Sequence, residues 1–359
     1  MDSGDRSVVV SGIGMVTPIG TGKTAFTGNL HAGRSGIGPI TAFDTGRFAS
    51  HLGAEATDFD PKSYISIKNR RRMDRLSQMA TASARMALED AGLAVTPANR
   101  DRVGIILGTA FGNTDVAARF VGTLFTEGPH RVNPILVPNT VMNAPAGHAA
   151  IELGFRGLNT TVNHREASAE TAIAYAAAEI RQGRADAILA GGADLFSPFF
   201  MEILSHFKAL SPLDDGVEAA RPYDRHRNGV ILGEGAGLLC LESREQALAR
   251  GVIPYCEIAG WGLSAASAPP TDWPDDSRGP VLAMERALAM AGIGPRDIDI
   301  VSGSANGGLR LDRLETDALT AVFAGGPGAP WVTSLKGALG ESFSSGGIRS
   351  AAMALSLKD

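Results

Sequence analysis

The stretch Thr161-Val162-Asn163-His164-Arg165-Glu166-Ala167-Ser168-Ala169 is the part of the sequence that best indicates the fold, because a β-branched run changes there into an alanine-rich one. Residues 160–163 are typical of a strand and residues 167–182 of a helix. At such a corner the first amides of the helix point at the corner side chain, which suits an anion, a thiolate or an oxyanion. Glu166 stands there, so its carboxylate is a candidate functional group. The alternative is a plain surface glutamate at a helix start.

The same change from short β-branched runs to longer alanine-rich runs recurs on both sides of this corner. Further strands are expected over residues 7–10, 103–107, 187–190, 237–241, 255–260 and 298–302. Further helices are expected over residues 73–91, 244–250 and 280–291. A glycine suited to a left-handed helix end follows each helix, at Gly92, Gly183, Gly251 and Gly292. This alternation predicts an α/β protein in which helices cover largely buried sheets.

A weak internal repeat suggests a duplicated architecture. Arg102-Val-Gly-Ile-Ile-Leu-Gly and Asp297-Ile-Asp-Ile-Val-Ser-Gly each follow a helix that ends in Ala-Gly-(Leu/Ile). A repeat of this length predicts two structurally similar units. We expect the chain to divide near residue 250, into an N-terminal half of residues 1–250 and a C-terminal half of residues 251–359.

The composition is that of an ordinary globular protein of 359 residues, with 44% hydrophobic and 20% charged side chains. Lys and Arg number 33 against 38 for Asp and Glu, so the net charge of -5 provides no basic surface for nucleic acid or an anionic membrane. No apolar run approaches the roughly 20 residues of a membrane span. The two cysteines, Cys240 and Cys256, are too few for a disulfide framework, which favours a cytoplasmic location.

Three patterns that would indicate a bound group are each incomplete. Gly12-x-Gly14 lacks the third glycine of a dinucleotide turn because Thr17 stands there, and Gly22-Lys23-Thr24 lacks the leading glycine of a phosphate loop. The seven histidines have no metal-ligand spacing. The sequence therefore predicts no cofactor and no metal. The glycines after the first strand, Gly12, Gly14 and Gly20, are expected to form a tight structural turn.

Six ordered blocks spread over the chain carry a resemblance to a known family. They are Val9-Val-Ser-Gly-Ile-Gly-Met-Val-Thr-Pro-Ile-Gly20, Arg71-Arg-Met-Asp-Arg-Leu-Ser-Gln-Met-Ala80, Val137-Pro-Asn-Thr-Val-Met-Asn-Ala-Pro-Ala-Gly-His148, Gly191-Gly-Ala-Asp194, Arg221-Pro-Tyr-Asp-Arg-His-Arg-Asn-Gly229 and Gly233-Glu-Gly-Ala-Gly237. With these blocks the chain resembles the β-ketoacyl synthases, the condensing enzymes of fatty-acid and polyketide assembly. The resemblance implies a thiolase-like fold built from two duplicated αβαβα layered halves.

The resemblance also implies that all three catalytic positions of that family are replaced here. The position of the nucleophilic cysteine is occupied by Glu166, and the position of the first histidine, eight residues before Asp312, by Ser304. The second histidine would follow the Lys336-Gly-Ala-Leu-Gly340 segment, where the chain has Glu341. A carboxylate cannot relay an acyl group usefully, because the mixed anhydride would be more reactive than the thioester that it replaced. None of the three catalytic residues of the family is therefore present. Lys336 is a charged residue near these positions.

A ketosynthase-like chain without its nucleophile resembles the chain length factors, the silent partners of type II polyketide ketosynthases. The resemblance implies a heterodimer with a β-ketoacyl synthase that works on an acyl carrier protein carrying acyl or malonyl groups, in an aromatic or a polyene pathway. Two alternatives stay open. One is a decarboxylase or hydrolase that uses Glu166 and Glu341 as a carboxylate pair on acyl carrier protein substrates. The other is a homodimeric remnant with only a scaffolding role.

By the same resemblance, further residues receive expected roles. The wall of the acyl tunnel, which sets product length, is expected to include Phe111, Thr114, Leu136, Thr140 and Met142. The strand expected to pair across the dimer axis contributes Thr160, Thr161, Val162 and Asn163. Ordinary core packing of the tunnel residues is the alternative. The family continues beyond the position of Asp359 through further strands, so the C-terminal half is expected to lack its closing strands.

Overall fold

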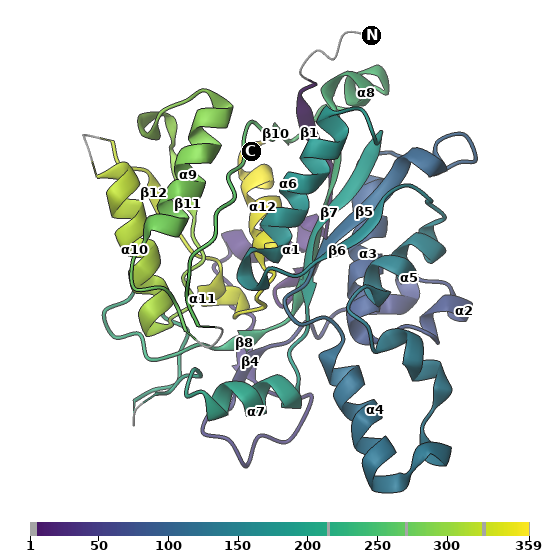
Figure 1. The fold of residues 1–359 in the computed structure, drawn as a ribbon, viewed down its shortest axis with the longest axis vertical. Coiled ribbons are helices and arrows are strands. Elements are labelled where there is room, and N and C mark those ends of the chain that lie inside the picture. Colours follow the sequence, from purple (N-terminus) through teal and green to yellow (C-terminus); the bar gives the residue numbers. More distant parts are fainter. Residues whose placement is uncertain (1–5, 214–215, 270–271, 325–327, 359) are drawn as a thin grey trace.

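The computed structural model describes residues 6–213, 216–269, 272–324 and 328–358, with helices and strands alternating along the chain (Figure 1). The strands are β1 (Val8–Thr17), β2 (Gly20–Thr21), β3 (Ile37–Pro39), β4 (Leu52–Ala54), β5 (Val103–Gly108), β6 (Asn159–Val162), β7 (Ala187–Asp194), β8 (Leu232–Gly233), β9 (Gly235–Ser243), β10 (Cys256–Glu257), β11 (Ile300–Ser302) and β12 (Trp331–Thr333). The helices are α1 (Lys23–His31), α2 (Ile67–Arg70), α3 (Arg75–Asp90), α4 (Thr114–Glu127), α5 (Ala144–Leu153), α6 (Ser168–Arg181), α7 (Pro198–His206), α8 (Arg244–Ala249), α9 (Arg278–Ala291), α10 (Leu309–Phe323), α11 (Lys336–Leu339) and α12 (Gly346–Ser356).

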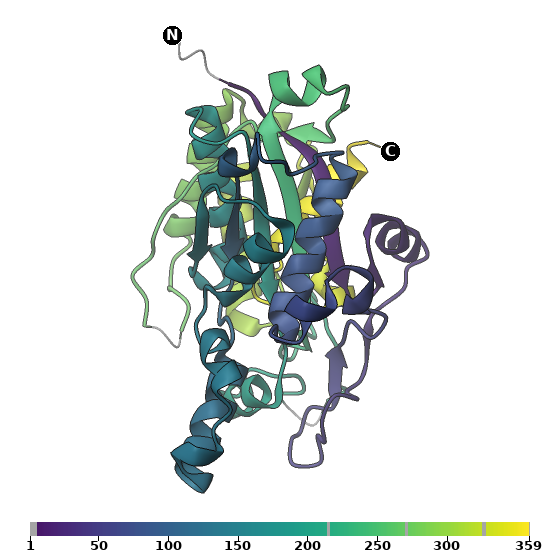
Figure 2. The ribbon, with the colours of Figure 1, turned by 90° about the vertical axis from the view of Figure 1, so that its right-hand side faces the viewer.

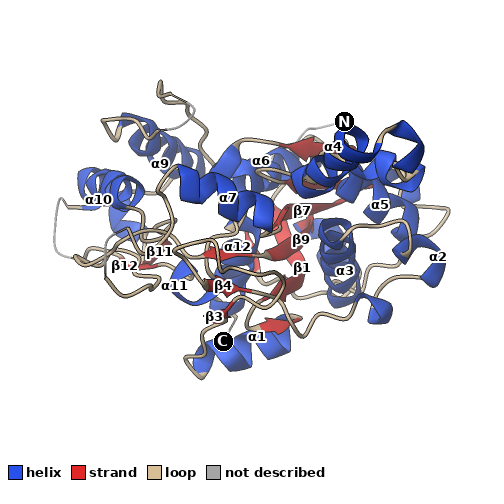
Figure 3. Cartoon of the chain, turned by 90° about the horizontal axis from the view of Figure 1, so that it is seen from below, coloured by secondary structure: helices blue, strands red, loops and turns tan. Residues whose placement is uncertain are grey.

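The largest sheet has the strand order β10-β1-β9-β7-β5-β6, and β2 pairs with the C-terminal end of β1. Strand β5 runs parallel to β6 and β7, whereas β9 runs antiparallel to β7 and β1. Every residue of β1, β5, β7 and β9 is buried, which is typical of a sheet covered on both faces. Helices α3 and α5 pack on one face and α6 and α12 on the other, as the view from below shows (Figure 3).

A second, smaller sheet belongs to the C-terminal part of the chain. It consists of β11 and β12, which run parallel. Helix α12 packs between the large sheet and β11, and α9 and α10 pack against each other on the outer side (Figure 1). The succession of helix layer, sheet, central helices, second sheet and outer helices is the layered thiolase-like arrangement that the resemblance implied.

The expected elements are found with two corrections: the strand expected over residues 255–260 is limited to β10, Cys256–Glu257, and the chain start differs. Strand β1 does not end before Gly12 but continues through Gly12 and Gly14 to Thr17. A β-carbon on Gly12 would lie 2.2 Å from the carbonyl oxygen of Ala87, and one on Gly14 would lie 1.9 Å from that of Ser83. These glycines are therefore not turn residues. They allow α3 to approach the strand closely, and the turn follows at positions 18–19.

The second half repeats this contact. The residues after β10 lie against α9 as β1 lies against α3, because a β-carbon on Gly260 would be 2.5 Å from the carbonyl oxygen of Ala287 and one on Gly262 only 1.8 Å from that of Ala283. The helix-ending glycines take the expected left-handed conformation, with φ of 58° at Gly92, 69° at Gly183, 76° at Gly251 and 70° at Gly292. We propose on this basis that the two halves meet near residue 250.

Candidate functional site

The corner between β6 and α6 carries the first candidate residue. After Val162 the chain passes through Arg165, whose φ of 51° is a left-handed conformation that non-glycine residues rarely adopt. Ser168 fixes the corner, because its hydroxyl accepts a hydrogen bond from the backbone N–H of His164 at 2.9 Å and donates one to the carbonyl oxygen of Arg165 at 2.5 Å. A short 3-10 turn over 165–167 then leads into α6. The expected strand-to-helix corner is confirmed.

The Glu166 side chain is largely buried, with 16% of its surface exposed, and an Arg165 guanidinium nitrogen lies 3.5 Å from its Oε1. Burial raises the pKa of the Glu166 carboxyl, and the Arg165 charge opposes this shift. Glu341 also raises this pKa, and Lys336 lowers it. The structure therefore brings Glu166 into electrostatic reach of the two residues that the sequence placed beside it.

Because its pKa is raised, Glu166 binds a proton more tightly in the folded chain than in the unfolded one. The contribution of Glu166 to the free energy of unfolding should then fall as the pH rises, since ionising this buried carboxyl opposes folding. We expect Glu166→Gln to remove this contribution, so that the variant depends less steeply on pH than the wild type and is neutral or slightly stabilising at pH 8. Urea unfolding of the wild type and the variant at pH 5 and pH 8 measures the free energy of unfolding of each. A large loss of stability in Glu166→Gln would show that Arg165 requires the charge.

Lys336 and Glu341 form a buried ion pair at the centre of the candidate site. Lys336 Nζ lies 2.7 Å from Glu341 Oε2, and the side chains are 2% and 0% exposed. The same Oε2 accepts a hydrogen bond from Asn306 Nδ2 at 2.7 Å, and Oε1 accepts one from the backbone N–H of Phe343 at 2.7 Å. Both carboxylate oxygens are thus paired, as a buried charge requires. Glu341 is thus held in place by Lys336, Asn306 and the Phe343 backbone.

Ser304 joins this network through Lys336, whose Nζ donates a hydrogen bond to Ser304 Oγ at 3.1 Å. Two carboxylates at the start of α10 hold the loop that carries Ser304. Glu315 accepts the N–H groups of Ser304 and Ala305, each at 2.7 Å, and Asp312 accepts that of Asn306 at 2.9 Å. The Ser304 side chain is therefore held in one place next to the ion pair.

Tyr223 supports both of these carboxylates from the other side. Its backbone N–H donates to Asp312 Oδ2 at 2.9 Å, and its hydroxyl donates to Glu315 Oε2 at 2.6 Å. Tyr223 itself has a left-handed φ of 61°. The block Arg221–Gly229 that carried the resemblance thus shapes the loop beneath Ser304.

Asp194 is a site residue that the sequence did not single out by itself, although it ends the Gly191–Asp194 block. It is buried and accepts hydrogen bonds from Thr109 Oγ1 at 2.8 Å and from the backbone N–H groups of Ala110 at 3.1 Å and Ser344 at 2.9 Å. Burial raises the pKa of this carboxyl to about 6. Asp194 therefore ties the loop after β5 to the loop that follows Glu341.

Phe111 lies on the loop that Asp194 holds and packs into an aromatic cluster. Its ring centre is 4.6 Å from that of Phe200 and 4.8 Å from that of Phe343, edge to face in the second case. Thr114 at the start of α4 donates its hydroxyl to the Phe111 carbonyl oxygen. Because Phe343 also hydrogen-bonds Glu341, the structure places Phe111 and Thr114 directly beside the candidate site.

The other three expected tunnel residues follow α4. Leu136 is half-buried in the 3-10 turn Pro134–Asn139, and Thr140 donates its hydroxyl to the Val137 carbonyl oxygen at 2.8 Å. Met142 touches the Phe111 loop, since a β-carbon on Gly112 would lie 3.0 Å from the Met142 Cα. Met142 therefore meets the loop of Phe111, whereas Leu136 and Thr140 lie in the segment that leads to it.

Strand β6 forms the outer edge of the large sheet, with one side of its backbone free of any strand among the described residues. Thr160 and Thr161 are half-buried, Val162 is buried, and the exposed Asn163 donates from Nδ2 to the carbonyl oxygen of Ala110 at 2.7 Å. Large apolar side chains are exposed on the neighbouring elements, on α4, on α5 and before β6: Val121, Phe125, Ile151 and Leu158. Figure 2 shows α4 extending away from the sheet beside this edge.

Other candidate groups from the sequence have structural roles. Lys23 forms an ion pair with Asp90 and donates to the Tyr255 hydroxyl at 2.6 Å, so it is engaged in packing α1 against α3. Within the described ranges no group of His, Cys, Asp and Glu is arranged to hold a metal ion. No helix in the described part of the chain is both long and apolar enough to cross a membrane.

Comparison with known sequences identifies the family. The profile of the β-ketoacyl synthase N-terminal domain matches residues 5–247, and that of the C-terminal domain matches residues 255–359. The chain is 38% identical over 299 residues to 3-oxoacyl-[acyl-carrier-protein] synthase 2 of Vibrio cholerae, a match that covers 83% of this chain and 72% of the relative. It is 32% identical over 357 residues to the synthase of the same name from Synechocystis sp. This match covers 99% of this chain and 86% of the relative.

Solved structures agree with these sequence matches. The ishigamide ketosynthase/chain length factor superimposes with a TM-score of 0.89 at 33% identity, over 98% of this chain and 86% of that one. A second match is a type II polyketide acyl-carrier protein in complex with its ketosynthase bound to the hexaketide. Its TM-score is 0.87 at 25% identity, over 99% of this chain and 87% of that one. The layered fold, the six blocks and these matches together show that the chain belongs to the β-ketoacyl synthase family.

Proposed function

We propose that this chain is a non-catalytic subunit of the chain length factor type, which pairs with a β-ketoacyl synthase and shapes the tunnel that sets product length. The observation that carries the proposal is the buried Lys336–Glu341 ion pair. A condensing site needs groups that stabilise negative charge on a thioester oxygen in the transition state. Here a paired carboxylate stands at the position of one histidine and the Ser304 hydroxyl at the other, and no thiol stands at position 166.

The surface around β6 supports the pairing part of the proposal. Antiparallel or parallel addition of a partner strand would satisfy the free backbone groups of this edge. The exposed Phe125 and Ile151, which are 82% and 70% exposed, would be covered in the same interface. Similarity to a ketosynthase/chain length factor, and to a ketosynthase that binds an acyl-carrier protein, favours a ketosynthase subunit and a carrier protein as partners.

The isolated chain should not be acylated when it is mixed with acyl carrier protein thioesters, because neither Glu166 nor Ser304 is an activated nucleophile. We expect no mass increase of the intact protein by mass spectrometry. Glu166→Cys should give partial acylation and no condensation, since Lys336 is engaged by Glu341 and no histidine is present. An acyl adduct on the wild-type chain at Glu166, Ser304 or Ser168 would contradict the proposal.

Co-expression with the ketosynthase subunit should convert the chain from a self-associated species into a defined heterodimer. An apolar interface that buries a whole sheet edge commonly leaves no stable monomer. Size exclusion with light scattering measures the assembly, and Ile151→Asp should weaken it, whereas Ile253→Asp, at an exposed position before β10, should not. A monodisperse monomer whose melting temperature does not change when the ketosynthase is added would count against the proposal.

The raised pKa of Glu166 supports a second candidate function, a carboxylate-based decarboxylase or hydrolase acting on acyl carrier protein substrates. A carboxyl whose pKa is raised keeps its proton to higher pH, as a general acid requires. The isolated chain would then release carbon dioxide from malonyl carrier protein, and Glu166→Gln would abolish the release. Equal background rates for the chain, this variant and buffer would exclude this candidate and leave the first unaffected.

A further inference from the structure

The carboxylate of Asp194 holds the loop that carries Phe111. This loop, residues 109–112, follows β5, and Asp194 ends the neighbouring strand β7. Asp194 Oδ1 accepts hydrogen bonds from Thr109 Oγ1 at 2.8 Å and from the backbone N–H of Phe111 at 3.3 Å. The backbone nitrogen of Ala110 lies 3.1 Å from each of the two carboxylate oxygens. Consecutive donors of one loop therefore share one acceptor group.

The second oxygen of Asp194 reaches another loop. Its Oδ2 accepts a hydrogen bond from the backbone N–H of Ser344 at 2.9 Å, in the loop of residues 340–345 between α11 and α12. The preceding residue, Phe343, supplies the ring that meets the Phe111 ring edge to face at 4.8 Å. One carboxylate thus binds the backbone next to both rings.

The ring contact by itself does not fix the spacing of these loops. Aromatic pairs are favourable over centroid separations of about 4.5–7 Å, so the two rings can slide without losing their attraction. The loop of Phe111 has other bonds, from Asn163 Nδ2 to the Ala110 carbonyl oxygen at 2.7 Å and from the Gly112 N–H to Thr109 Oγ1 at 2.9 Å. These bonds hold the loop to the end of β6 and to itself, whereas those of Asp194 reach the loop of Phe343.

The Asp194 carboxylate depends on these loops as much as they depend on it. Its side chain is almost fully buried, and hydrogen-bond donors of Ser344, Thr109 and Ala110 are the groups that favour its charged form. A buried carboxylate without such donors would be strongly destabilised. Loss of one donor therefore disturbs the carboxylate and, through it, the position of the other loop.

We propose that Asp194 is a positioning residue for product length, which sets the distance between the Phe111 and Phe343 rings from behind the tunnel wall. This inference rests on the proposed function, because product length depends on these rings only if the chain shapes an acyl tunnel. Both oxygens of Asp194 are engaged by backbone, so it acts through the two rings and not by contact with the acyl chain.

Two variants of nearly unchanged shape test the inference. In Asp194→Asn, either orientation of the amide leaves one backbone N–H facing another donor, that of Phe111 or that of Ser344. Thr109→Val removes the hydroxyl that donates to Asp194 and accepts from Gly112, and it leaves the carboxylate in place. If Asp194→Asn does not fold, this milder variant decides the outcome alone.

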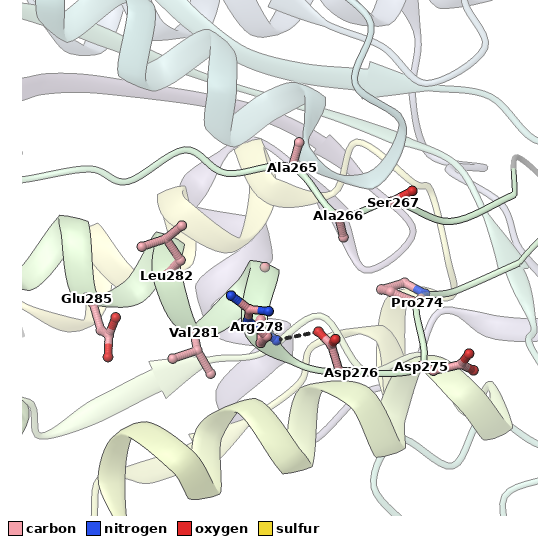
Figure 4. Close-up of a pocket in the computed structure, with 11 residues that line it drawn as sticks. Ala265, Ala266, Ser267, Pro274, Asp275, Asp276, Arg278, Val281, Leu282 and Glu285 are labelled. Carbon is pink, nitrogen blue, oxygen red and sulfur yellow. Dashed lines mark hydrogen bonds between the residues drawn. The ribbon is translucent and has the colours of Figure 1, made fainter.

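Each variant has a matched control elsewhere in the chain. Thr81→Val makes the same change at an equally buried hydroxyl that has no hydrogen-bond partner among the described residues. Asp276→Asn changes an exposed carboxylate that accepts the backbone N–H of Arg278 at 3.0 Å, beside the hollow between residues 265–267 and α9 (Figure 4). Neither control touches the loops of Phe111 and Phe343, so neither should move the rings.

The position of the Phe111 ring is read by fluorine NMR, with 4-fluorophenylalanine placed at position 111 only. The full chain is measured alone and with the ketosynthase subunit, below the melting temperature of each variant. We expect one resonance in the unaltered chain and in both controls, and a displaced or second resonance in Asp194→Asn and Thr109→Val. A purely structural role would lower the melting temperature without moving this resonance. An unmoved resonance in the folded variants would overturn the proposal.

Product lengths of the heterodimer give the second measurement. Asp194→Asn should shift the product distribution by whole two-carbon units, and adding it to Phe111→Ala should cause no further shift, because it acts through that ring. Additive shifts would overturn the proposal. So would a shift in Phe111→Ala without one in Asp194→Asn, whereas unchanged product lengths in Phe111→Ala itself would count against the proposed function.

Discussion

Lys336→Met should destabilise the protein by about 3–5 kcal/mol, because it leaves Glu341 as a buried and uncompensated charge. Glu341 would keep the hydrogen bonds from Asn306 and from the Phe343 backbone, and these two neutral donors cannot replace an ammonium group. Chemical denaturation at neutral pH measures the loss.

A double variant distinguishes charge compensation from simple packing. Lys336→Met combined with Glu341→Gln removes both charges and keeps an oxygen that can accept from Asn306, so most of the lost stability should return. Arg310→Met, which breaks a half-exposed ion pair with Asp272 and Asp275, serves as the matched control and should cost far less. If the double variant were as unstable as Lys336→Met, packing of the lysine stem rather than its charge would explain the effect.

Phe111→Ala in the reconstituted heterodimer should lengthen the products by whole two-carbon units. Phe111 packs against Phe200 and Phe343, and removing its ring would open space beside both. The initial rate of condensation should stay roughly constant, because in the proposed heterodimer the reacting groups belong to the partner subunit. Mass spectrometry of the product distribution measures the shift. Leu136→Ala, in the segment before Met142, should act in the same direction with a smaller change.

The matched control for this variant is Phe207→Ala, which removes an exposed ring at the end of α7. Melting temperatures of both heterodimers should be recorded, since loss of the Phe111 ring also removes packing in the aromatic cluster. Unchanged product lengths together with lower total activity would mean that Phe111 only supports the fold. The length-setting role of this wall would then be wrong.

Local patterns in the sequence predicted the main strands of the large sheet and four of the helices, whereas α4, α5, α7, α10 and α12 were not predicted. The strand-to-helix corner at Glu166 and the four helix-ending glycines depend on a few neighbouring residues, and the structure confirms them. The interpretation of Gly12 and Gly14 as turn residues was wrong for an instructive reason. A glycine in a turn and a glycine that admits a neighbouring helix look alike in sequence, and the contact with Ser83 and Ala87 exists only in the folded chain.

The arrangement of the candidate site could be predicted only in part. Family resemblance located Ser304, Lys336 and Glu341, but no spacing rule indicated that the lysine and the glutamate form a closed buried pair. Asp194 could not be recognised as a link between two loops, because its partners lie about 84 and 150 positions away in the sequence. Long-range hydrogen bonds of this kind are set by the packing of the sheet and leave no local pattern.

The edge of β6, which no strand of the described residues covers, bears on how a cell can make this protein. A newly synthesised chain presents that edge, together with Phe125 and Ile151, to every other unfinished chain nearby, and unpaired edges of this kind template aggregation. Molecules that do not find a partner quickly would be captured by chaperones or degraded. For the proposed heterodimer, the amount of this chain that accumulates should therefore follow the supply of the ketosynthase subunit rather than its own rate of translation, with any surplus cleared as an orphan subunit.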